Sequence, residues 1–204
     1  MISLNAFHRL FAVPILLFIV LHLVNHLFAM VSLELHIAVM EKLRVLYRNP
    51  IVEFLLIVSL LFQLSLGLYF TYKLRGQRRG FFEKAQVWSG LYLCVFIIVH
   101  VSATFNARYN LGLDTNFYFA SAGMHLVDLS LFFVPYYLLA ISAVFTHIAC
   151  AVRWQLSQNY TINKANTVGG LIIGLGVMVG LLVVLSLNGA FYSVNIPADY
   201  KVMF

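Results

Sequence analysis

The sequence predicts an all-α integral membrane protein with five transmembrane helices. Three observations lead to this prediction: the chain is 62% hydrophobic, only 10% of its residues are charged, and the charges gather between long apolar runs. A soluble domain has about 25% charged residues. The few polar side chains cannot cover such an apolar chain in water. Its surroundings must therefore be largely lipid.

Five runs free of Asp, Glu, Lys and Arg mark the spans. Each run reaches or approaches the ~20 residues that a helix needs to cross ~30 Å of hydrocarbon. Unpaired backbone groups cannot face lipid, so all five spans are expected to be helices. The runs predict a single transmembrane domain over residues 1–204, with spans at about residues 9–32, 52–73, 85–107, 129–152 and 167–191.

The charges of the loops predict the orientation. Cytoplasmic loops carry an excess of Lys and Arg. One side of the membrane would carry Arg9, Lys73, Arg75, Arg78, Arg79, Lys84, Arg153 and Lys164. The other side would carry only Lys42, Arg44, Arg48, Arg108 and Lys201. We therefore expect a cytoplasmic N-terminus and an outer C-terminus, and the net charge of +6 reflects topology rather than nucleic-acid binding.

Two loops on the predicted outer side have a structure of their own. The first, Ser32 to Pro50, mixes apolar and charged residues in a pattern typical of an amphipathic helix at the membrane surface. The third, Asn106 to Asp128, is rich in aromatic residues and is expected to form a structured cap. His36 and His125 lie in these loops, where we expect solvated surface positions.

Small residues inside the spans are expected to serve packing. Cys94 and Cys150 both fall in apolar stretches and form no CxxC pair, so they predict neither a disulfide nor a zinc site. In the fifth span, small residues four positions apart let a neighbouring helix approach closely. These pairs are Gly170 with Gly174, and Gly176 with Gly180.

Two histidines lie deep in the predicted spans. His22 is the thirteenth residue of the run that begins at Leu10, and His100 is the sixteenth of the run that begins at Ala85. Both spans cross in the same direction, so the imidazoles differ in height by only about 5 Å. Polar side chains are costly in the bilayer and mark functional sites. A haem iron needs two axial imidazoles at one height on facing helices, which makes His22 and His100 its candidate ligands.

The stretches before these two histidines are similar. Residues 16–22 read LLFIVLH and residues 93–100 read LCVFIIVH. Both place a histidine after an apolar stretch at similar depth. An internal relation and a chance similarity between two Leu-rich helices both account for this.

Four further residues are candidates for cofactor contacts. His26 follows His22 by one turn on the same helix face, where it could bond a haem propionate or a quinone, or simply lie near the outer headgroups. His147 lies late in the fourth span, and His8 begins the first span beside Arg9. His8, Arg9 and His147 are expected at the cytoplasmic boundary, where they line a quinone site, contact propionates, or serve as interfacial polar residues.

Short segments on the first four spans carry a family resemblance. They are residues 13–14 (VP) with 22–26 (HLVNH), 61–69 (LFQLSLGLY), 89–90 (SG) with His100, and 143–147 (AVFTH). In this order they resemble the five-helix cytochrome b membrane anchor of succinate dehydrogenase and fumarate reductase. The fifth span matches by hydropathy alone.

The resemblance implies a four-helix haem-binding bundle with a fifth packing helix, in a bacterial inner membrane. Two-haem members of the family use one histidine from each of the first four helices. His22 and His100 match the outer pair, and His147 matches the fourth-helix ligand. The second-helix position holds Gln63, and an amide is a poor haem ligand beside imidazole. We therefore expect one haem b, with an inner haem that is absent or held by His147 alone.

The resulting prediction is a b-type cytochrome-like membrane subunit that transfers electrons between a redox partner and the quinone pool. Expected partners are soluble flavoprotein and iron–sulfur subunits, or another redox protein, together with quinone and lipid. The chain has no flavin motif and no iron–sulfur cysteines, so we expect an electron-transfer subunit rather than a catalyst alone. One alternative is a haem-free anchor or assembly protein. The other is a non-haem metal protein that uses His22 and His26 with His100 or His125.

Overall fold

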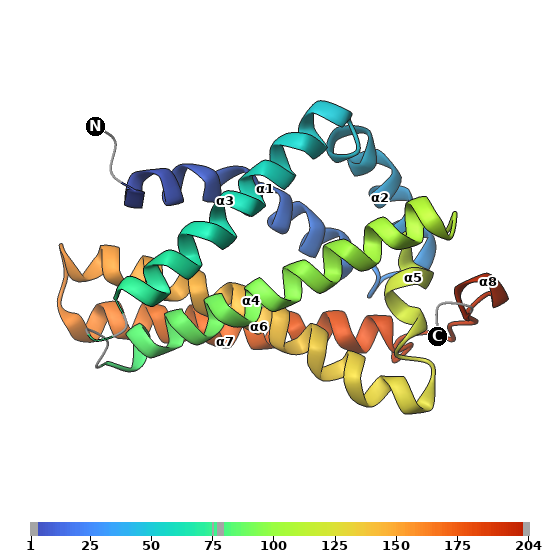
Figure 1. The fold of residues 1–204 in the computed structure, drawn as a ribbon. Helices are drawn as coiled ribbons and strands as arrows, with labels where there is room; N and C mark the ends of the chain where they lie inside the picture. Colours follow the sequence, from blue (N-terminus) through green and yellow to red (C-terminus); the bar gives the residue numbers. More distant parts are fainter. Residues whose placement is uncertain (1–3, 75, 77–79, 202–204) are drawn as a thin grey trace. The chain divides into compact units, whose positions relative to one another are not determined.

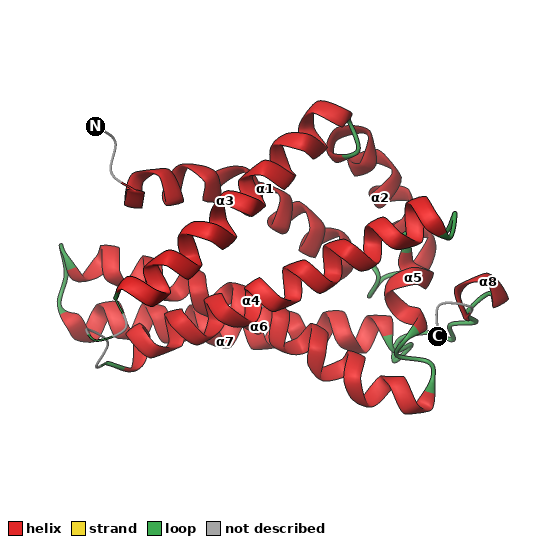
Figure 2. Ribbon diagram, in the orientation of Figure 1, coloured by secondary structure: helices red, strands yellow, loops and turns green. Residues whose placement is uncertain are grey.

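The computed structural model describes residues 4–74, 76 and 80–201. Within these residues the protein is all-α and has no strand (Figure 2). Five of the described helices are long and apolar enough to cross a membrane, which confirms the predicted fold class. They are α1 (Leu4–Phe28), α3 (Pro50–Lys73), α4 (Phe81–Phe105), α6 (Val127–Ser157) and α7 (Ile162–Leu187) (Figure 1). The predicted orientation depends on Arg75, Arg78 and Arg79, which lie outside the described residues, and it stays a prediction.

The chain forms two compact units, Met1–Gln77 (unit 1) and Arg78–Phe204 (unit 2). In unit 1, α1, α2 (Leu33–Tyr47) and α3 each pack against the other two. The side chain of Asn49 accepts hydrogen bonds from the first N–H groups of α3. Pro50 follows in the first turn of α3, where its missing N–H leaves no bond unmade.

The first predicted loop helix is confirmed as α2. One face of α2 is buried through residues four positions apart: His36, Met40 and Arg44. His36 is only 2% exposed, so the expectation of a solvated position is wrong. The helical spacing turns this histidine toward α1, where it bonds the carbonyl of Asn25. Charge alone places it in a loop and does not reveal this orientation. The location of α2 at the membrane surface stays a prediction.

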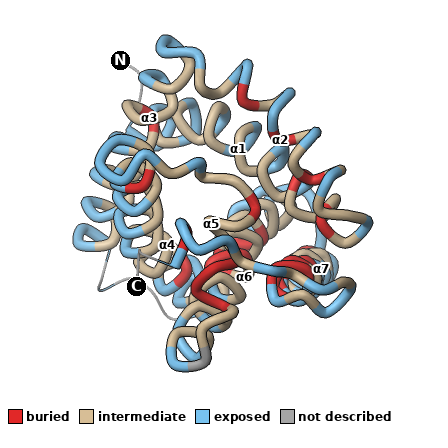
Figure 3. The backbone as a smooth tube through the Cα atoms, turned by 90° about the vertical axis from the view of Figure 1, so that its right-hand side faces the viewer, coloured by how far each residue is buried: buried red, intermediate tan, exposed pale blue. Residues whose placement is uncertain are grey.

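In unit 2, α7 packs along α6, and the two helices hold much of the buried surface (Figures 1 and 3). Glycines make this packing close. A Cβ at Gly176 would overlap the side chain of Phe145, and one at Gly180 would lie 3.0 Å from a leucine of α6. At Gly170 and Gly174 a Cβ would meet no neighbour in unit 2. Only one of the two predicted glycine pairs therefore serves the α6–α7 contact.

Two tyrosines join α4 to α6. The hydroxyl of Tyr92 donates a hydrogen bond to the carbonyl of Tyr136, with an oxygen–oxygen distance of 2.9 Å. The hydroxyl of Tyr136 donates in return to the carbonyl of Phe96, at 3.4 Å. Each half-buried hydroxyl thus has a backbone acceptor, which offsets its cost in an apolar surrounding.

The third predicted loop is confirmed as a structured segment. It contains a π-helical turn, η1 (Asn106–Asn110), and a short helix, α5 (Phe117–Ala122). Phe117 in α5 is fully buried. The hydroxyl of Tyr200, in the terminal helix α8 (Ala198–Lys201), donates a hydrogen bond to the carbonyl of Asp114 at 3.0 Å. The segment therefore packs as a cap over one end of unit 2.

The cap also binds the end of α7. The carbonyl of Leu187, the last residue of α7, accepts a hydrogen bond from the hydroxyl of Ser121 at 2.5 Å. Gly189 follows with φ +77°, a conformation that glycine adopts without strain and that ends helices. The fifth span therefore stops at Leu187, earlier than residue 191, because a glycine turn follows it.

Candidate functional site: the histidines of the spans

Each of the two predicted haem ligands stacks on a phenylalanine one turn earlier in its helix. On α1, the ring centroids of Phe18 and His22 lie 5.4 Å apart and the ring planes differ by 18°. On α4, Phe96 and His100 lie 5.1 Å apart with planes at 12°. Residues four apart share a helix face, so each phenyl ring covers one face of its imidazole. The same arrangement recurs on two spans. In both, the phenyl ring covers a face of the imidazole and does not cover the edge that carries the ring nitrogens.

A row of three imidazoles joins α1 to α2 in unit 1. The ring centroid of His26 lies 4.7 Å from that of His22 and 5.2 Å from that of His36. His22 and His26 are close, as their one-turn spacing predicts. His36 is an addition from the loop helix that the sequence analysis missed. The four-residue spacing of His36, Met40 and Arg44 is the signal that could have identified it.

The orientation of His36 is fixed by a hydrogen bond. Its Nδ1 donates to the backbone carbonyl of Asn25 at 2.9 Å, so Nε2 of the neutral ring is an acceptor. Burial lowers the pKa of His36, and the nearby positive charge of Arg44 lowers that pKa further. Arg44 is itself buried and forms an ion pair with Glu41 at 2.7 Å. His36 is therefore a neutral imidazole beside a paired guanidinium.

His147 on α6 is oriented by α4. Its Nδ1 lies 3.2 Å from the carbonyl oxygen of Gln86 and 3.3 Å from the hydroxyl of Ser89. Gly90 makes this approach possible, because a Cβ there would lie only 3.2 Å from Cε1 of the imidazole. A carbonyl bond to one ring nitrogen is the arrangement that orients many ligating histidines through the other nitrogen. It also suits a purely structural tie between the two helices.

At the start of α1, His8 is tied to α3. Its carbonyl accepts a hydrogen bond from the side-chain amide of Gln63 at 2.9 Å. Its ring lies edge-on to Phe70, with centroids 5.8 Å apart. The neighbouring Arg9 is exposed. The side-chain amide of Gln63, which the resemblance predicts at the second-helix ligand position, is thus hydrogen-bonded to the backbone of α1.

A cavity of about 200 Å³ lies beside His100, within unit 2. Its walls come from α4, η1, α5 and α6. Most lining residues are apolar or aromatic, and they include Phe119, Phe133 and Tyr137. The imidazole of His100 therefore forms part of the wall of an aromatic cavity.

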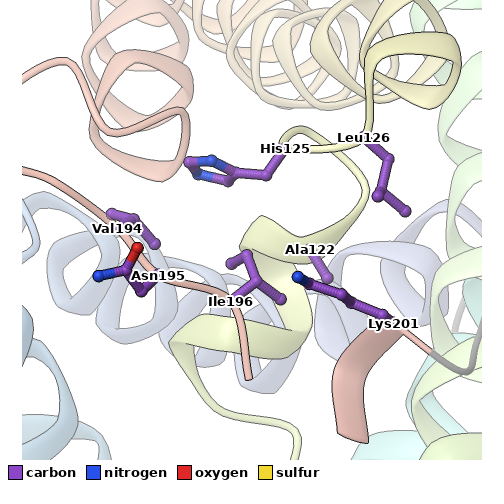
Figure 4. A pocket seen from close by; sticks show the side chains of 7 residues that line it. All are labelled: Ala122, His125, Leu126, Val194, Asn195, Ile196 and Lys201. Carbon is purple, nitrogen blue, oxygen red and sulfur yellow. The ribbon is translucent and has the colours of Figure 1, made fainter. Parts of the chain in front are cut away.

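A second cavity, of about 260 Å³, lies between the cap and the C-terminal segment (Figure 4). His125, Asn195 and Lys201 supply its polar side chains. Nε2 of His125 lies 3.1 Å from the carbonyl oxygen of Leu187, so this imidazole fastens the cap to the end of α7. His125 is half-buried and hydrogen-bonded rather than fully solvated as expected.

The structure brings some of the candidate residues together and leaves other pairings open. His22 and His26 lie together in unit 1, whereas His100 and His147 belong to unit 2. The pairing of His22 with His100 across a haem, and a shared site of His8 and His147, therefore stay predictions. Within residues 4–74, 76 and 80–201, no three His, Cys, Asp or Glu side chains are grouped so that they could hold a metal ion.

Comparison with known proteins adds no assignment. No protein-family model, no curated protein and no solved structure matches this chain. The resemblance to the succinate dehydrogenase anchor rests on its short motifs alone and stays a prediction.

Proposed function

We propose that this chain is a b-type cytochrome-like membrane subunit that passes electrons between a redox partner and the quinone pool, with one haem b ligated by His22 and His100. The observation that supports it most is the matched pair of stacks, Phe18 with His22 and Phe96 with His100, on two apolar spans. A six-coordinate haem of this kind needs two imidazoles, each held in one orientation and shielded from water.

The surroundings of these imidazoles suit such a group. Tyr137 lies edge-on to His100, with centroids 6.5 Å apart, in addition to the Phe96 stack. When bound, the haem would supply a one-electron carrier whose potential depends on its ligands, hydrogen bonds and burial. The role of the protein would be to hold the two imidazoles and to exclude water. His26, 4.7 Å from His22, would offer a hydrogen bond to a carboxylate of the group or to quinone.

At the other end of the spans, we assign His8, Arg9 and His147 to quinone or propionate contacts. The hydrogen bond that Nδ1 of His147 donates to the carbonyl of Gln86 supports an imidazole whose Nε2 is free to act. The bond between Gln63 and His8 supports a single haem, because it ties the Gln63 side chain to α1 through its nitrogen and leaves only the amide oxygen, a poor haem ligand beside imidazole. A complete second pair of imidazoles is then not expected.

The proposal extends to location and partners. The five apolar helices indicate an integral membrane protein. The excess of Lys and Arg on one side supports a cytoplasmic N-terminus, and the family resemblance supports a bacterial inner membrane. Soluble flavoprotein and iron–sulfur subunits, or another redox protein, would dock on the membrane surface and exchange electrons with the bundle.

Reduction by a quinol tests this function. Menadiol added anaerobically to the purified full chain should produce the absorption band of a reduced b-type haem. His22→Ala and His100→Ala should each lose the band, and added imidazole should restore it by replacing the missing ligand. A wild-type chain whose haem is not reduced by menadiol contradicts the function. A colourless chain that copurifies with a soluble partner favours the haem-free anchor instead.

A further inference from the structure

The cavity beside His100 has features of a ligand site that neither the span histidines nor the family resemblance accounts for. Its volume is about 200 Å³. Sites for drug-sized ligands occupy about 300–1,000 Å³. A cavity of this size suits one or two fused rings and is too small for a porphyrin macrocycle. Its occupant would therefore be distinct from the proposed haem.

The aromatic walls of the cavity come from two helices, α5 and α6. Phe119 of α5 faces it from the cap, and Phe133, Tyr136 and Tyr137 line it from α6. Tyr136 and Tyr137 are themselves in contact, with centroids 5.2 Å apart. Aromatic walls favour offset or edge-on contacts with a planar ring.

Two hydrogen-bond donors lie among these apolar walls. The hydroxyl of Tyr137 makes no hydrogen bond with any of the described residues, in contrast to Tyr92 and Tyr136, which both bond carbonyls. The amide of Asn106 accepts from Asn110 at 2.8 Å through its oxygen, which leaves its NH₂ group to donate. Two donors in an aromatic cavity suit a planar ligand that carries carbonyl acceptors.

The backbone around Asn106 is itself unusual. Asn106 and Ala107 begin the π-helical turn η1, and both line the cavity. Single π-helical turns inside or after α-helices occur often at functional sites, because the extra residue redirects side chains. Here the turn places a polar amide at the edge of an otherwise apolar wall.

Most exposed residues that line the cavity are apolar, and Asn106 is the polar one among them. Val99, Leu111 and Phe132 line the cavity and are 46%, 45% and 56% exposed. A largely apolar rim favours a ligand that arrives from the bilayer rather than from water. Such a ligand is lipid-soluble, planar and small, and it carries carbonyl oxygens.

We infer that this cavity binds the ring of a quinone, with Tyr137 and Asn106 donating hydrogen bonds to its carbonyl oxygens. The choice of quinone among planar carbonyl compounds rests on the proposed electron-transfer function. The site itself rests on the cavity, its aromatic walls and its two donors, all of which lie in unit 2.

Binding of menadione to the purified full chain, measured by calorimetry, tests this inference. The matched ligand is 2-methylnaphthalene, which has the same two rings and no carbonyl oxygen. Menadione should bind wild type more tightly than 2-methylnaphthalene. Tyr137→Phe should weaken menadione binding about fivefold, the equivalent of one net hydrogen bond, and leave 2-methylnaphthalene unchanged. Ala103→Phe, which places a ring in the cavity, should weaken both ligands at least tenfold.

Tyr160→Phe is the control, because Tyr160 is 52% exposed and does not line the cavity. It should bind menadione like wild type. Equal binding of menadione to wild type and Tyr137→Phe would overturn the inference, as would full binding by Ala103→Phe or equal affinity for the two ligands. The readout does not need haem: a haem-free chain with Tyr137-dependent menadione binding contradicts only the cytochrome proposal. A menadiol-reducible chain without such binding contradicts only the quinone site.

Discussion

The side-chain amide of Gln63 donates a hydrogen bond to the backbone carbonyl of His8, across 2.9 Å. This bond joins α3 to α1 within the apolar part of unit 1. It gives a structural reason for an amide at a position where the resembling family has a haem ligand. The bond also bears on the number of haems, because it holds the Gln63 side chain on α1 and leaves only an amide oxygen, a poor haem ligand beside imidazole.

Replacing Gln63 should therefore leave the haem content unchanged. In Gln63→Leu, one intramembrane hydrogen bond of about 0.6 kcal/mol is lost. The buried Oε1, which has no hydrogen-bond partner in the described residues, disappears as well and offsets that loss. Haem per chain and the thermal unfolding midpoint should both stay close to wild type. A loss of haem in Gln63→Leu would show that this residue does take part in holding the cofactor.

The buried His36 should make stability depend on pH. Its folded-state pKa is lowered by burial and by Arg44, so the unfolded chain takes up the proton first as the pH falls. The contribution to stability is complete above the ordinary value of 6.5 and is lost progressively below it, down to the folded-state pKa. The thermal unfolding midpoint should therefore decrease as the pH is lowered from 7.5 to 5.

His36→Gln is the matched variant for this prediction. Glutamine keeps an N–H donor for the Asn25 carbonyl and does not titrate, while the facing groups His26, Arg44 and Glu41 are unchanged. The fall of the unfolding midpoint should be smaller in His36→Gln than in wild type. An identical fall in both proteins would show that His36 is not the group responsible.

Two glycines of α7 should respond in opposite ways to the same substitution. A methyl group at Gly176 would overlap Phe145, so Gly176→Ala should destabilise the α6–α7 contact by about 1–3 kcal/mol. Gly174 meets no neighbour in unit 2, so Gly174→Ala should stay within about 1 kcal/mol of wild type or gain slightly in helix stability. Denaturant unfolding of the two variants in one detergent provides the comparison. Equal losses in both would contradict a contact that runs through the Gly176 face and not through the Gly174 face.

The five helices were predictable because charge-free runs of sufficient length have one physical solution in lipid. The ends of the helices were harder to predict. Helix α7 stops at Leu187 because of the turn at Gly189, although the apolar run of the sequence continues. The sequence also could not say which glycine pair of α7 faces α6, since both have the same spacing. That choice depends on which face of α6 offers a matching side chain, here Phe145.

The candidate site was predictable in part. The closeness of His22 and His26 follows from helical spacing, and both stacks on phenylalanine follow the same rule. His36 was missed because charge and hydropathy place it in a loop, while its burial arises from tertiary contact between α1 and α2. The cavity beside His100 was missed for a similar reason: it needs α4, η1, α5 and α6 together.

The central claim is that one haem b is held by His22 and His100. The most direct measurement is the pyridine-haemochrome content of the purified chain, determined for wild type, His22→Ala and His100→Ala. The account predicts one haem b per wild-type chain and none in either variant. Two haems per wild-type chain, no haem in wild type, or full haem content in either variant would contradict it.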